Sequence, residues 1–460
     1  MESLIILIFV IGYLAITLEH PLRLDKTVPA LIMAAVIWGL LAVGFSIGWF
    51  DVIDTEGSIF SMLTGDQHAM HGFEQTLLHH LGKTAEILIF LIGAMTIVEI
   101  IDLHRGFEIL KGAVKTDSKK SLLWIIGVLA FILSAIIDNL TATIVLVTLL
   151  RKLISDKGDR IWYASMVVIA ANAGGAWSPI GDVTTTMLWI AKKVSAGGLI
   201  EFVVLPSILC FILPFFIASY LKPFQGKMSI PKSQDEASGR LLSSKVMLYL
   251  GLGMIVSVPV FKTLTHLPPY VGMMLALGVV WLVSEYIHPE EPYTKERRHF
   301  YSVHKALAKI EMSSILFFLG ILMAVAGLES LVYGATQSGE PVGTLRYLAE
   351  SLQEAIPNQD VVVMLLGVFS AVIDNVPLVA ASIGMYDAPI DSVLWHFIAY
   401  SAGTGGSMLI IGSAAGVAAM GMERINFIWY LKKVDWLAFV GFLAGAGLFL
   451  FIERVLFHHV

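Results

Sequence analysis

The sequence predicts an all-α polytopic membrane protein built from two inverted repeats, and three observations predict it. Of the 460 residues, 57% are hydrophobic and only 14% are charged, which is more apolar than a water-soluble chain that must cover its surface with charge. Apolar stretches of about 20 residues, the length that crosses a bilayer, recur along the chain. Polar and glycine motifs also recur in the same order in both halves. The bilayer is therefore expected to hold nearly the whole chain.

Ten stretches are predicted to be continuous membrane spans, because each is long and apolar enough to cross the hydrocarbon core. The first two, and the two between residues 241 and 288, carry no polar motif and are expected to be framework. The ten predicted spans are 3–19, 28–50, 84–103, 161–191, 201–222, 241–261, 269–288, 310–335, 394–420 and 427–453.

Two further apolar segments, 121–150 and 360–386, are predicted to be re-entrant hairpins. Each has an Asp-Asn pair at its middle, Asp138-Asn139 in the first and Asp374-Asn375 in the second. A carboxylate halfway along a lipid-facing span costs at least ~3 kcal/mol, whereas irregular backbone is tolerated where it lines a protein cavity. The Asp-Asn pairs are therefore expected at the tips of the hairpins.

The charge of the connecting loops supports these hairpins independently. Lys and Arg concentrate on the cytoplasmic side of a membrane protein, and the loops alternate between basic and nearly uncharged. The predicted outer segments 51–83, 262–268 and 336–360 carry only Lys83, Lys262 and Arg346 as basic residues. The alternation holds only if 121–150 enters and leaves on the cytoplasmic side and 360–386 on the outer side, which places both termini outside.

An internal repeat divides the chain. Ser134–Asn139 resembles Ser370–Asn375, and residues 87–91 resemble 315–319. A glycine pair followed by a third glycine also matches, Gly174, Gly175 and Gly181 with Gly405, Gly406 and Gly412. Chance similarity among apolar helices is the alternative, but the matches include polar residues and glycines in the same order. The loop charges orient the two copies oppositely, the inverted plan of secondary transporters. The predicted division is 1–83 for the first spans and an outer loop, 84–222 for repeat 1 with hairpin 121–150, 223–310 for loops and two framework spans, and 311–460 for repeat 2 with hairpin 360–386.

Each repeat contains a second interruption after its hairpin, at residues 172–182 and 403–413. Glycine pairs, with Pro179 in the first copy, weaken a helix, and a broken helix exposes carbonyl oxygens inside the membrane. Close helix packing through small residues is the alternative. The pairing of each break with a hairpin tip favours a site, whose backbone would come from Gly174, Gly175, Gly181, Gly405, Gly406 and Gly412.

The carboxylates near these interruptions predict a site for Na+ or Li+ at Asp138 and Asp182. A carboxylate is a hard oxygen ligand that can hold either an alkali cation or a proton, and two carboxylates in one region favour a cation. The alternative is that some of these residues only cap short helices. Ser407 and Ser413 are weaker candidates. The residues predicted to bind the ion and exchange the proton are Asp138, Asn139, Thr141, Asn172, Asp182, Thr184, Asp374 and Asn375, with Thr143 as a further hydroxyl.

The partners expected from these motifs and from the apolar composition are monovalent cations, protons and membrane lipid. A net charge of -6 argues against nucleic acid, because phosphate binding needs a concentrated basic surface. The single Cys210 allows neither an intramolecular disulfide nor a cysteine metal cluster, and no cofactor is expected.

Four histidines of the outer segment 51–83 are expected in a solvated loop, with pH sensing as the alternative; they are His68, His71, His79 and His80.

The motifs 134–143, 178–185 and 373–377 closely resemble those of the NhaD family of bacterial sodium/proton antiporters, in the ion transporter superfamily. The resemblance covers essentially the full length. It implies exchange of Na+ or Li+ for H+, a role in pH homeostasis, a bacterial inner membrane location and a homodimer. It also implies scaffold and transport domains with elevator-like movement. The second tip has Pro377 where the first has Thr141, so Asp138 and Asp182 are expected to matter more than Asp374.

The leading hypothesis is therefore a secondary transporter, not an enzyme, in which Asp138 and Asp182 bind cation and proton in turn during alternating access. The alternative is a Na+- or H+-coupled symporter of an organic acid or oxyanion on the same fold. Such a symporter would need cationic or neutral donor groups at the hairpin tips, which carry no Lys or Arg. A channel fits two symmetric gated hairpins less well. An intramembrane aspartic protease would give the repeat and the glycine-rich breaks no role.

Overall fold

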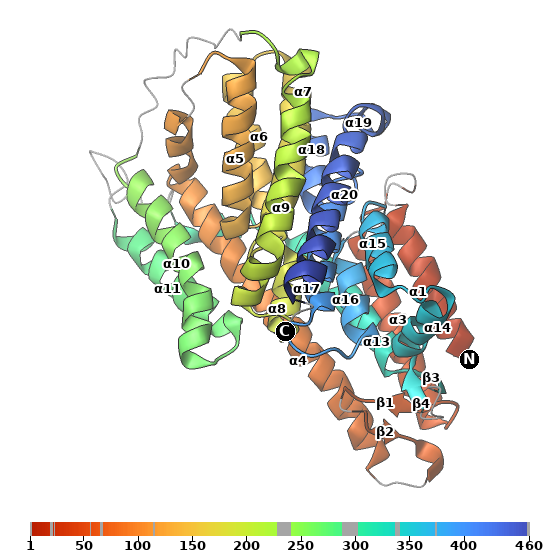
Figure 1. Ribbon diagram of the computed structural model, residues 1–460. Coiled ribbons are helices and arrows are strands. Elements are labelled where there is room, and N and C mark those ends of the chain that lie inside the picture. Colours follow the sequence, from red (N-terminus) through yellow and green to blue (C-terminus); the bar gives the residue numbers. More distant parts are fainter. Residues whose placement is uncertain are drawn as a thin grey trace. The chain divides into compact units, whose positions relative to one another are not determined.

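The protein is a multi-pass integral membrane protein made mostly of helices (Figure 1). The computed structural model describes residues 2–18, 22, 24–55, 57–64, 68–113, 116–227, 241–287, 302–335, 341–372 and 375–457. Within these ranges, eight helices are long and apolar enough to cross a membrane, which confirms the predicted class. They are Thr27–Ser46, Ala69–Leu103, Lys119–Ile137, Ala196–Ala218, Ser244–Thr265, Pro269–Tyr286, Met312–Ser330 and the helical stretch Asp435–Val455.

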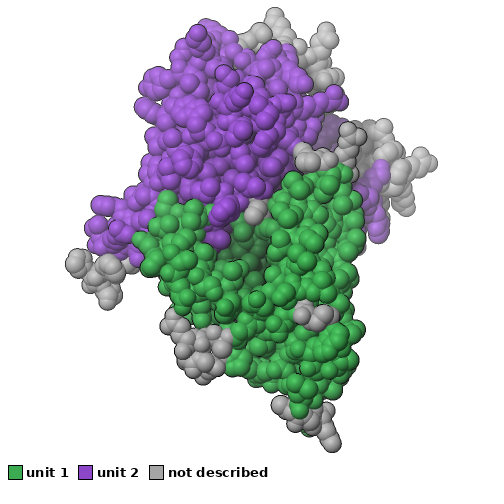
Figure 2. All heavy atoms as spheres, turned by 90° about the vertical axis from the view of Figure 1, so that its right-hand side faces the viewer, with its two compact units in different colours: residues 1–89, 311–365, 376–389 green, residues 90–310, 366–375, 390–460 purple. Residues whose placement is uncertain are grey.

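The contacts divide the chain into two compact units, each assembled from segments that are distant in sequence (Figure 2). Unit 1 comprises residues 1–89, 311–365 and 376–389, and unit 2 comprises residues 90–310, 366–375 and 390–460. This division by contact differs in kind from the division into consecutive segments, 1–83, 84–222, 223–310 and 311–460, that the repeat predicts. The division by repeat stays a prediction.

Unit 1 is built around the packing of α3 (Thr27–Ser46) against α13 (Met312–Ser330). Gly320 lies directly against the backbone of Ala30, and Trp38 Nε1 donates a hydrogen bond to the Met323 carbonyl at 2.8 Å. Small residues allow helices to approach this closely in a membrane. The remaining helices of unit 1 are α1 (Glu2–Thr17), the first part of α4 (Ala69–Leu103), η1 (Met62–Thr64), α14 (Thr344–Ala355) and most of α15 (Gln359–Phe369) and α16 (Asn375–Met385).

Two short antiparallel strand pairs also belong to unit 1. β1 (Val52–Ile53) pairs with β2 (Ile59–Phe60), and β3 (Val332–Ala335) pairs with β4 (Pro341–Gly343). β1 and β2 lie in the predicted outer segment 51–83, β4 lies in 336–360, and β3 lies at the end of the predicted span 310–335. The predicted loops thus contain strands and the span ends earlier, so these boundaries were wrong.

The expected solvated loop with four histidines is also wrong, because residues 69–83 form the first four turns of α4. The buried positions in this stretch are Ala69, Gly72, Phe73, Thr76 and His80, spaced as one face of a helix. His80 is only 5% exposed. Its Nε2 lies 3.0 Å from Ser330 Oγ on α13. Small and polar residues on this buried face lower the local hydropathy, which is why the sequence suggested a loop.

Unit 2 contains the helices that carry the predicted motifs. Its helices α9 (Ala196–Ala218) and α20 (Asp435–Ile452) pack side by side (Figure 1), with Gly441 and Gly445 against the carbonyls of Cys210 and Pro206. The other helices are the last part of α4, η2 (Gly106–Ala113), α5 (Lys119–Ile137), α6 (Asn139–Leu153), α7 (Lys157–Gly175), α8 (Val183–Ile190), η3 (Lys222–Phe224), α10 (Ser244–Thr265), α11 (Pro269–Tyr286), α12 (Val303–Leu307), α17 (Val393–Gly405), α18 (Ala414–Glu423), α19 (Phe427–Lys433) and the π-helical turn η6 (Glu453–Phe457).

The predicted interruptions coincide with helix ends. The segment 161–191, expected as one span, is divided into α7 and α8, and 394–420 is divided into α17 and α18. The two continuous spans were therefore wrong, while the breaks predicted at 172–182 and 403–413 are present. Segment 121–150 likewise consists of α5 and α6, which meet at Asp138.

Candidate functional site

The first hairpin turns at a single residue in an unusual backbone conformation. Asp138 separates α5 from α6 with φ 78° and ψ 156°, a region that is essentially restricted to glycine and costs about 1–3 kcal/mol for other residues. Its carboxylate accepts hydrogen bonds from Thr141 N and Thr141 Oγ1, both at 2.8 Å. Asp138 is half-buried and caps α6, as the capping alternative predicts, and its role in ion binding stays a prediction. Thr141 serves the same cap.

Asp182, at the end of the first break, lies at the centre of the buried polar residues. It is 2% exposed, and its Oδ1 accepts a hydrogen bond from Thr184 N at 3.0 Å, which caps α8. Its Oδ2 accepts hydrogen bonds from Asn139 Nδ2 at 2.8 Å and from Asn375 Nδ2 at 3.3 Å. Asn139 begins α6 and Asn375 begins α16, so residues from both halves of the chain meet on one carboxylate oxygen.

A second line of hydrogen bonds joins the two breaks. Asn139 Nδ2 also donates to Asn172 Oδ1 at 3.1 Å, and Asn172 Nδ2 donates to Ser413 Oγ at 2.9 Å. Ser413 in turn caps α18 by accepting from Gly416 N. Asn139, Asn172 and Ser413 are all buried. The structure therefore unites the predicted residues Asn139, Asn172, Asp182 and Asn375 with Ser413, one of the weaker candidates.

Two fully buried hydroxyls next to this network have no hydrogen-bond partner among the described residues. Thr184 Oγ1 follows the α8 cap, and Thr143 Oγ1 lies one turn after Asn139 on α6. Thr185 and Thr186, by contrast, donate to the carbonyls of Ser178 and Pro179 and hold the break in shape. A buried unpaired hydroxyl costs about 1–3 kcal/mol. Hydroxyl and carboxylate oxygens are the ligands that hard cations prefer.

The glycines of the two breaks are required by close packing, and the same contacts recur in both copies. Gly174 lies against the Phe131 carbonyl as Gly405 lies against the Gly367 carbonyl, and in each case a Cβ atom would overlap the backbone. A matching set joins Gly175 to Gly181, Gly406 to Gly412, Gly181 to Ser134, and Gly412 to Ala371. Both breaks therefore show the close packing through small residues that was the alternative prediction for these glycines.

Some predicted residues are not part of this network. Asp374 lies outside the described residues. Ser407 Oγ donates to the Thr404 carbonyl within the turn that follows α17, so it makes a local contact. Sequence reasoning also overlooked Gly403, which faces Asp182 Oδ2. Gly403 could have been found from its alignment with Asn172 in the first break, because a glycine at that position leaves room beside the Asp182 carboxylate.

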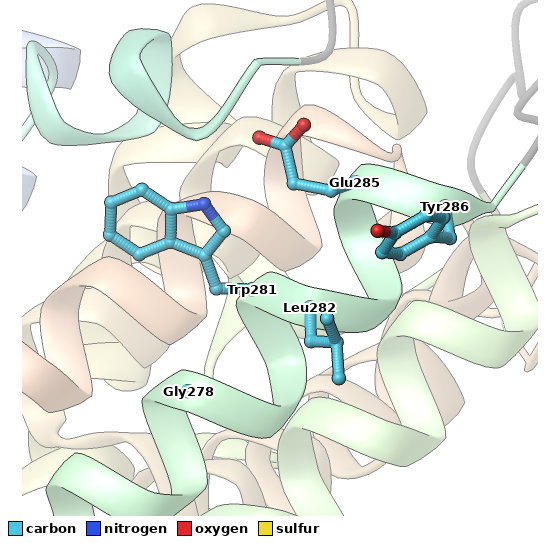
Figure 3. Close-up of a pocket in the computed structure, with 5 residues that line it drawn as sticks. All are labelled: Gly278, Trp281, Leu282, Glu285 and Tyr286. Carbon is cyan, nitrogen blue, oxygen red and sulfur yellow. The ribbon is translucent and has the colours of Figure 1, made fainter.

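The candidate residues are buried between helices rather than exposed in an open pocket. The pocket drawn in Figure 3 has a volume of about 390 Å³ and lies elsewhere, on α11. Its lining residues all come from that one helix and offer a single carboxylate, that of Glu285, so they do not converge on a ligand as the residues around Asp182 do. They are Gly278, Trp281, Leu282, Glu285 and Tyr286.

Comparison with known proteins gives consistent matches over nearly the whole chain. The model of the citrate transporter family, CitMHS, matches residues 7–398. Sodium/proton antiporter 1 of Arabidopsis thaliana is 42% identical over 98% of this chain and 72% of its own length, and sodium/proton antiporter 2 of the same plant is 41% identical over 97% and 99%. The Na(+)/H(+) antiporter NhaD of Alkalimonas amylolytica is 31% identical over 98% and 91%.

Proposed function

Because the chain belongs to the NhaD-type sodium/proton antiporter family within the citrate transporter family, we propose that it exchanges Na+ or Li+ for H+ across the membrane. The observation that carries this proposal is the buried Asp182 carboxylate, which accepts hydrogen bonds from the asparagines of both hairpin tips. The names of the similar proteins support Na+ and H+ as the exchanged ions.

Asp182 suits exchange because a carboxylate can hold either an alkali cation or a proton. The two compete for the same oxygens, so the binding of one displaces the other. The groups described around it are neutral amides, hydroxyls and backbone N–H groups. They can support either occupant without competing for the charge.

The asparagines at the tips can serve both occupants. An amide carries a donor and an acceptor, so Asn139 and Asn375 donate N–H groups to a free carboxylate and can rotate to present carbonyl oxygens to a cation. Thr143 and Thr184 would add their unpaired hydroxyl oxygens. Asp138, whose carboxylate is engaged by Thr141, is the second carboxylate of the proposal and would carry a proton or a cation when its cap opens.

Alternating access would follow from the repeated architecture. The alternation of loop charge orients the two copies oppositely, with re-entrant hairpins at 121–150 and 360–386, as in other secondary transporters. The recurrence of the glycine contacts in both breaks supports this plan. The proposed cycle exposes Asp182 to one side of the membrane and then to the other.

The proposal is tested with purified protein in liposomes that contain a trapped pH dye and hold an imposed pH gradient. Na+, Li+, K+ or citrate is added, and wild type is compared with Asp182→Asn. Asp156→Asn is the matched control, because Asp156 caps α7 as Asp182 caps α8 but is exposed. We expect Na+ and Li+ to collapse the gradient with wild type and the control but not with Asp182→Asn. A response to citrate alone would favour the organic-acid symporter, and an unaffected Asp182→Asn would refute the role of this carboxylate.

A further inference from the structure

A buried carboxylate outside the candidate site joins three helices of unit 2. Glu423, the last residue of α18, is 3% exposed. Its Oε1 accepts a hydrogen bond from Arg151 Nε at 2.7 Å, and its Oε2 accepts one from Arg160 Nε at 3.0 Å. Arg151 lies in the last turn of α6, and Arg160 lies at the start of α7. These three residues are called the Glu423 cluster.

The Glu423 cluster is not what local helix stability would select. A carboxylate at a helix C-terminus and a guanidinium near a helix N-terminus both oppose the helix dipole. Burial adds a desolvation cost that only good pairing offsets, and removing one partner of a buried pair leaves an uncompensated buried charge. Arg160 Nη1 also donates to the Ile154 and Ser155 carbonyls at 3.0 and 3.1 Å. The cluster therefore fixes the α6–α7 connection as well as the end of α18.

The same three helices lead from the Glu423 cluster to the candidate site. α6 begins at Asn139, α18 begins directly after Ser413, and α7 carries Asn172 near its end. α18 packs against both α6 and α7. The 15 residues of α6 span about 22 Å at the rise of an α-helix. Because helices are stiff along their axes, holding their far ends limits how far Asn139, Asn172 and Ser413 can slide past one another.

The other half of the chain has a comparable contact at the positions that align with the Glu423 cluster. Asp391, in the α16–α17 connection, accepts a hydrogen bond from Ser195 N at 2.6 Å, and its own N donates to the Lys193 carbonyl at 2.9 Å. Asp391 aligns with Arg160, and the residues after α8 align with the end of α18. Each repeat thus contacts the end of the other repeat's broken helix. Glu423 makes the more deeply buried and more highly charged of the two contacts, since the Asp391 side chain is 34% exposed.

We propose that Glu423 is a positioning residue for cation binding. Acting through Arg151 and Arg160, it fixes the relative positions of those ends of α6, α7 and α18 that lie at the candidate site. The inference rests on the proposed function of the site. Loss of the carboxylate frees α18 to shift along α6, which lengthens the Asn172–Ser413 contact and loosens the amides around Asp182. Weakening one hydrogen bond by about 1 kcal/mol corresponds to a roughly fivefold loss of affinity. The effect is therefore expected in KM for Na+ rather than in Vmax.

The experiment is a Na+ titration of gradient collapse in proteoliposomes for wild type, Glu423→Gln, Arg151→Gln and Glu108→Gln. Glu423→Gln keeps the side-chain shape and removes the charge. Arg151→Gln leaves Glu423 paired with Arg160, so it should destabilise the protein less. It tests the same positioning of the helices if Glu423→Gln does not fold. Glu108→Gln is the matched control, because Glu108 forms an exposed ion pair with Lys152 at the same end of α6.

We expect KM for Na+ to rise about 3- to 10-fold in Glu423→Gln, to rise less in Arg151→Gln and to stay at the wild-type value in Glu108→Gln, with similar Vmax in all four. A lower thermal stability of folded Glu423→Gln or Arg151→Gln with an unchanged KM would overturn the proposal and leave the cluster a purely structural contact. Failure of the proposed function would look different, since wild type itself would then show no response to Na+.

Discussion

The two breaks of unit 2 have nearly the same backbone but different chemistry. Asp182 caps α8 at φ -147° and ψ 147°, and the aligned Ser413 caps α18 at φ -143° and ψ 154°. The glycine contacts before both caps also match. The first break, however, carries Asn172 and Asp182 where the second carries Gly403 and Ser413. At the two breaks, therefore, similar sequences form similar backbone frames, and the first break carries a carboxylate where the second carries a hydroxyl.

The largest expected difference between the copies is at the caps themselves. Asp182→Ser should reduce Na+-dependent gradient collapse by at least about 100-fold, because it removes the carboxylate that accepts hydrogen bonds from two buried amides. Ser413→Ala, in the aligned position, should change the rate only a few-fold, since it removes one neutral hydrogen bond. The measurement is the initial rate in proteoliposomes. Equal losses in the two variants would contradict the unequal chemistry of the breaks.

Alanine substitutions at the glycines of the two breaks should lower the stability of the protein equally in the two copies. Gly174→Ala and Gly405→Ala each place a Cβ atom against a backbone carbonyl, which we expect to destabilise the protein by about 1–3 kcal/mol. Gly421→Ala is the control, because Gly421 lies in α18 with nothing within 4 Å of its Cβ position. Thermal unfolding in detergent should show similar losses for the first two variants and none for the control. A loss confined to one copy would mean that the frame is less symmetric than its contacts indicate.

The two hairpin tips should differ by a smaller amount. Asn139 contacts both Asp182 and Asn172, at 2.8 and 3.1 Å, whereas Asn375 contacts Asp182 at 3.3 Å. Asn139→Ala should therefore raise KM for Na+ about tenfold, and Asn375→Ala should raise it less. The Na+ titration used above measures both. The reverse order would show that the second tip is the main partner of the cation.

The smallest expected effect concerns the unpaired hydroxyl of Thr184, whose aligned residue is Ala415. Thr184→Val keeps the shape and removes the oxygen, so the free energy of unfolding should stay the same or rise by about 1 kcal/mol. If the hydroxyl binds the cation, KM for Na+ should increase about 2- to 5-fold in the same variant. Thr185→Val is the contrasting variant, because it removes hydrogen bonds to the Ser178 and Asp182 carbonyls and should lower stability. An unchanged KM in Thr184→Val would remove this oxygen from the proposed ligands.

The predictability of the fold and of the candidate site depends on how local each signal is. The apolar stretches, the Asp-Asn interruption at Asp138 and the glycine breaks are each contained in about 20 residues or fewer, and the helices do end at these positions. The extent of α4 was missed because its first turns bury Gly72, Thr76 and His80, residues that hydropathy assigns to water. The sequence predicted Asp138 and Asp182 together as the ion site, whereas in the structure Asp182 alone of these two accepts hydrogen bonds from both Asn139 and Asn375.

Hydropathy and glycine content were sufficient to predict the membrane class, the places where helices break and the polar residues near those breaks, because both act on the adjacent backbone. Which of these residues meet depends on the packing of helices that are distant in sequence. Asp182 contacts Asn139 and Asn375 across 43 and 193 residues of sequence, and Glu423 contacts Arg151 across 272. Such contacts depend on how helices pack against one another. The polarity of a single residue does not indicate its partner, because that polarity is the same whether the partner is present or not.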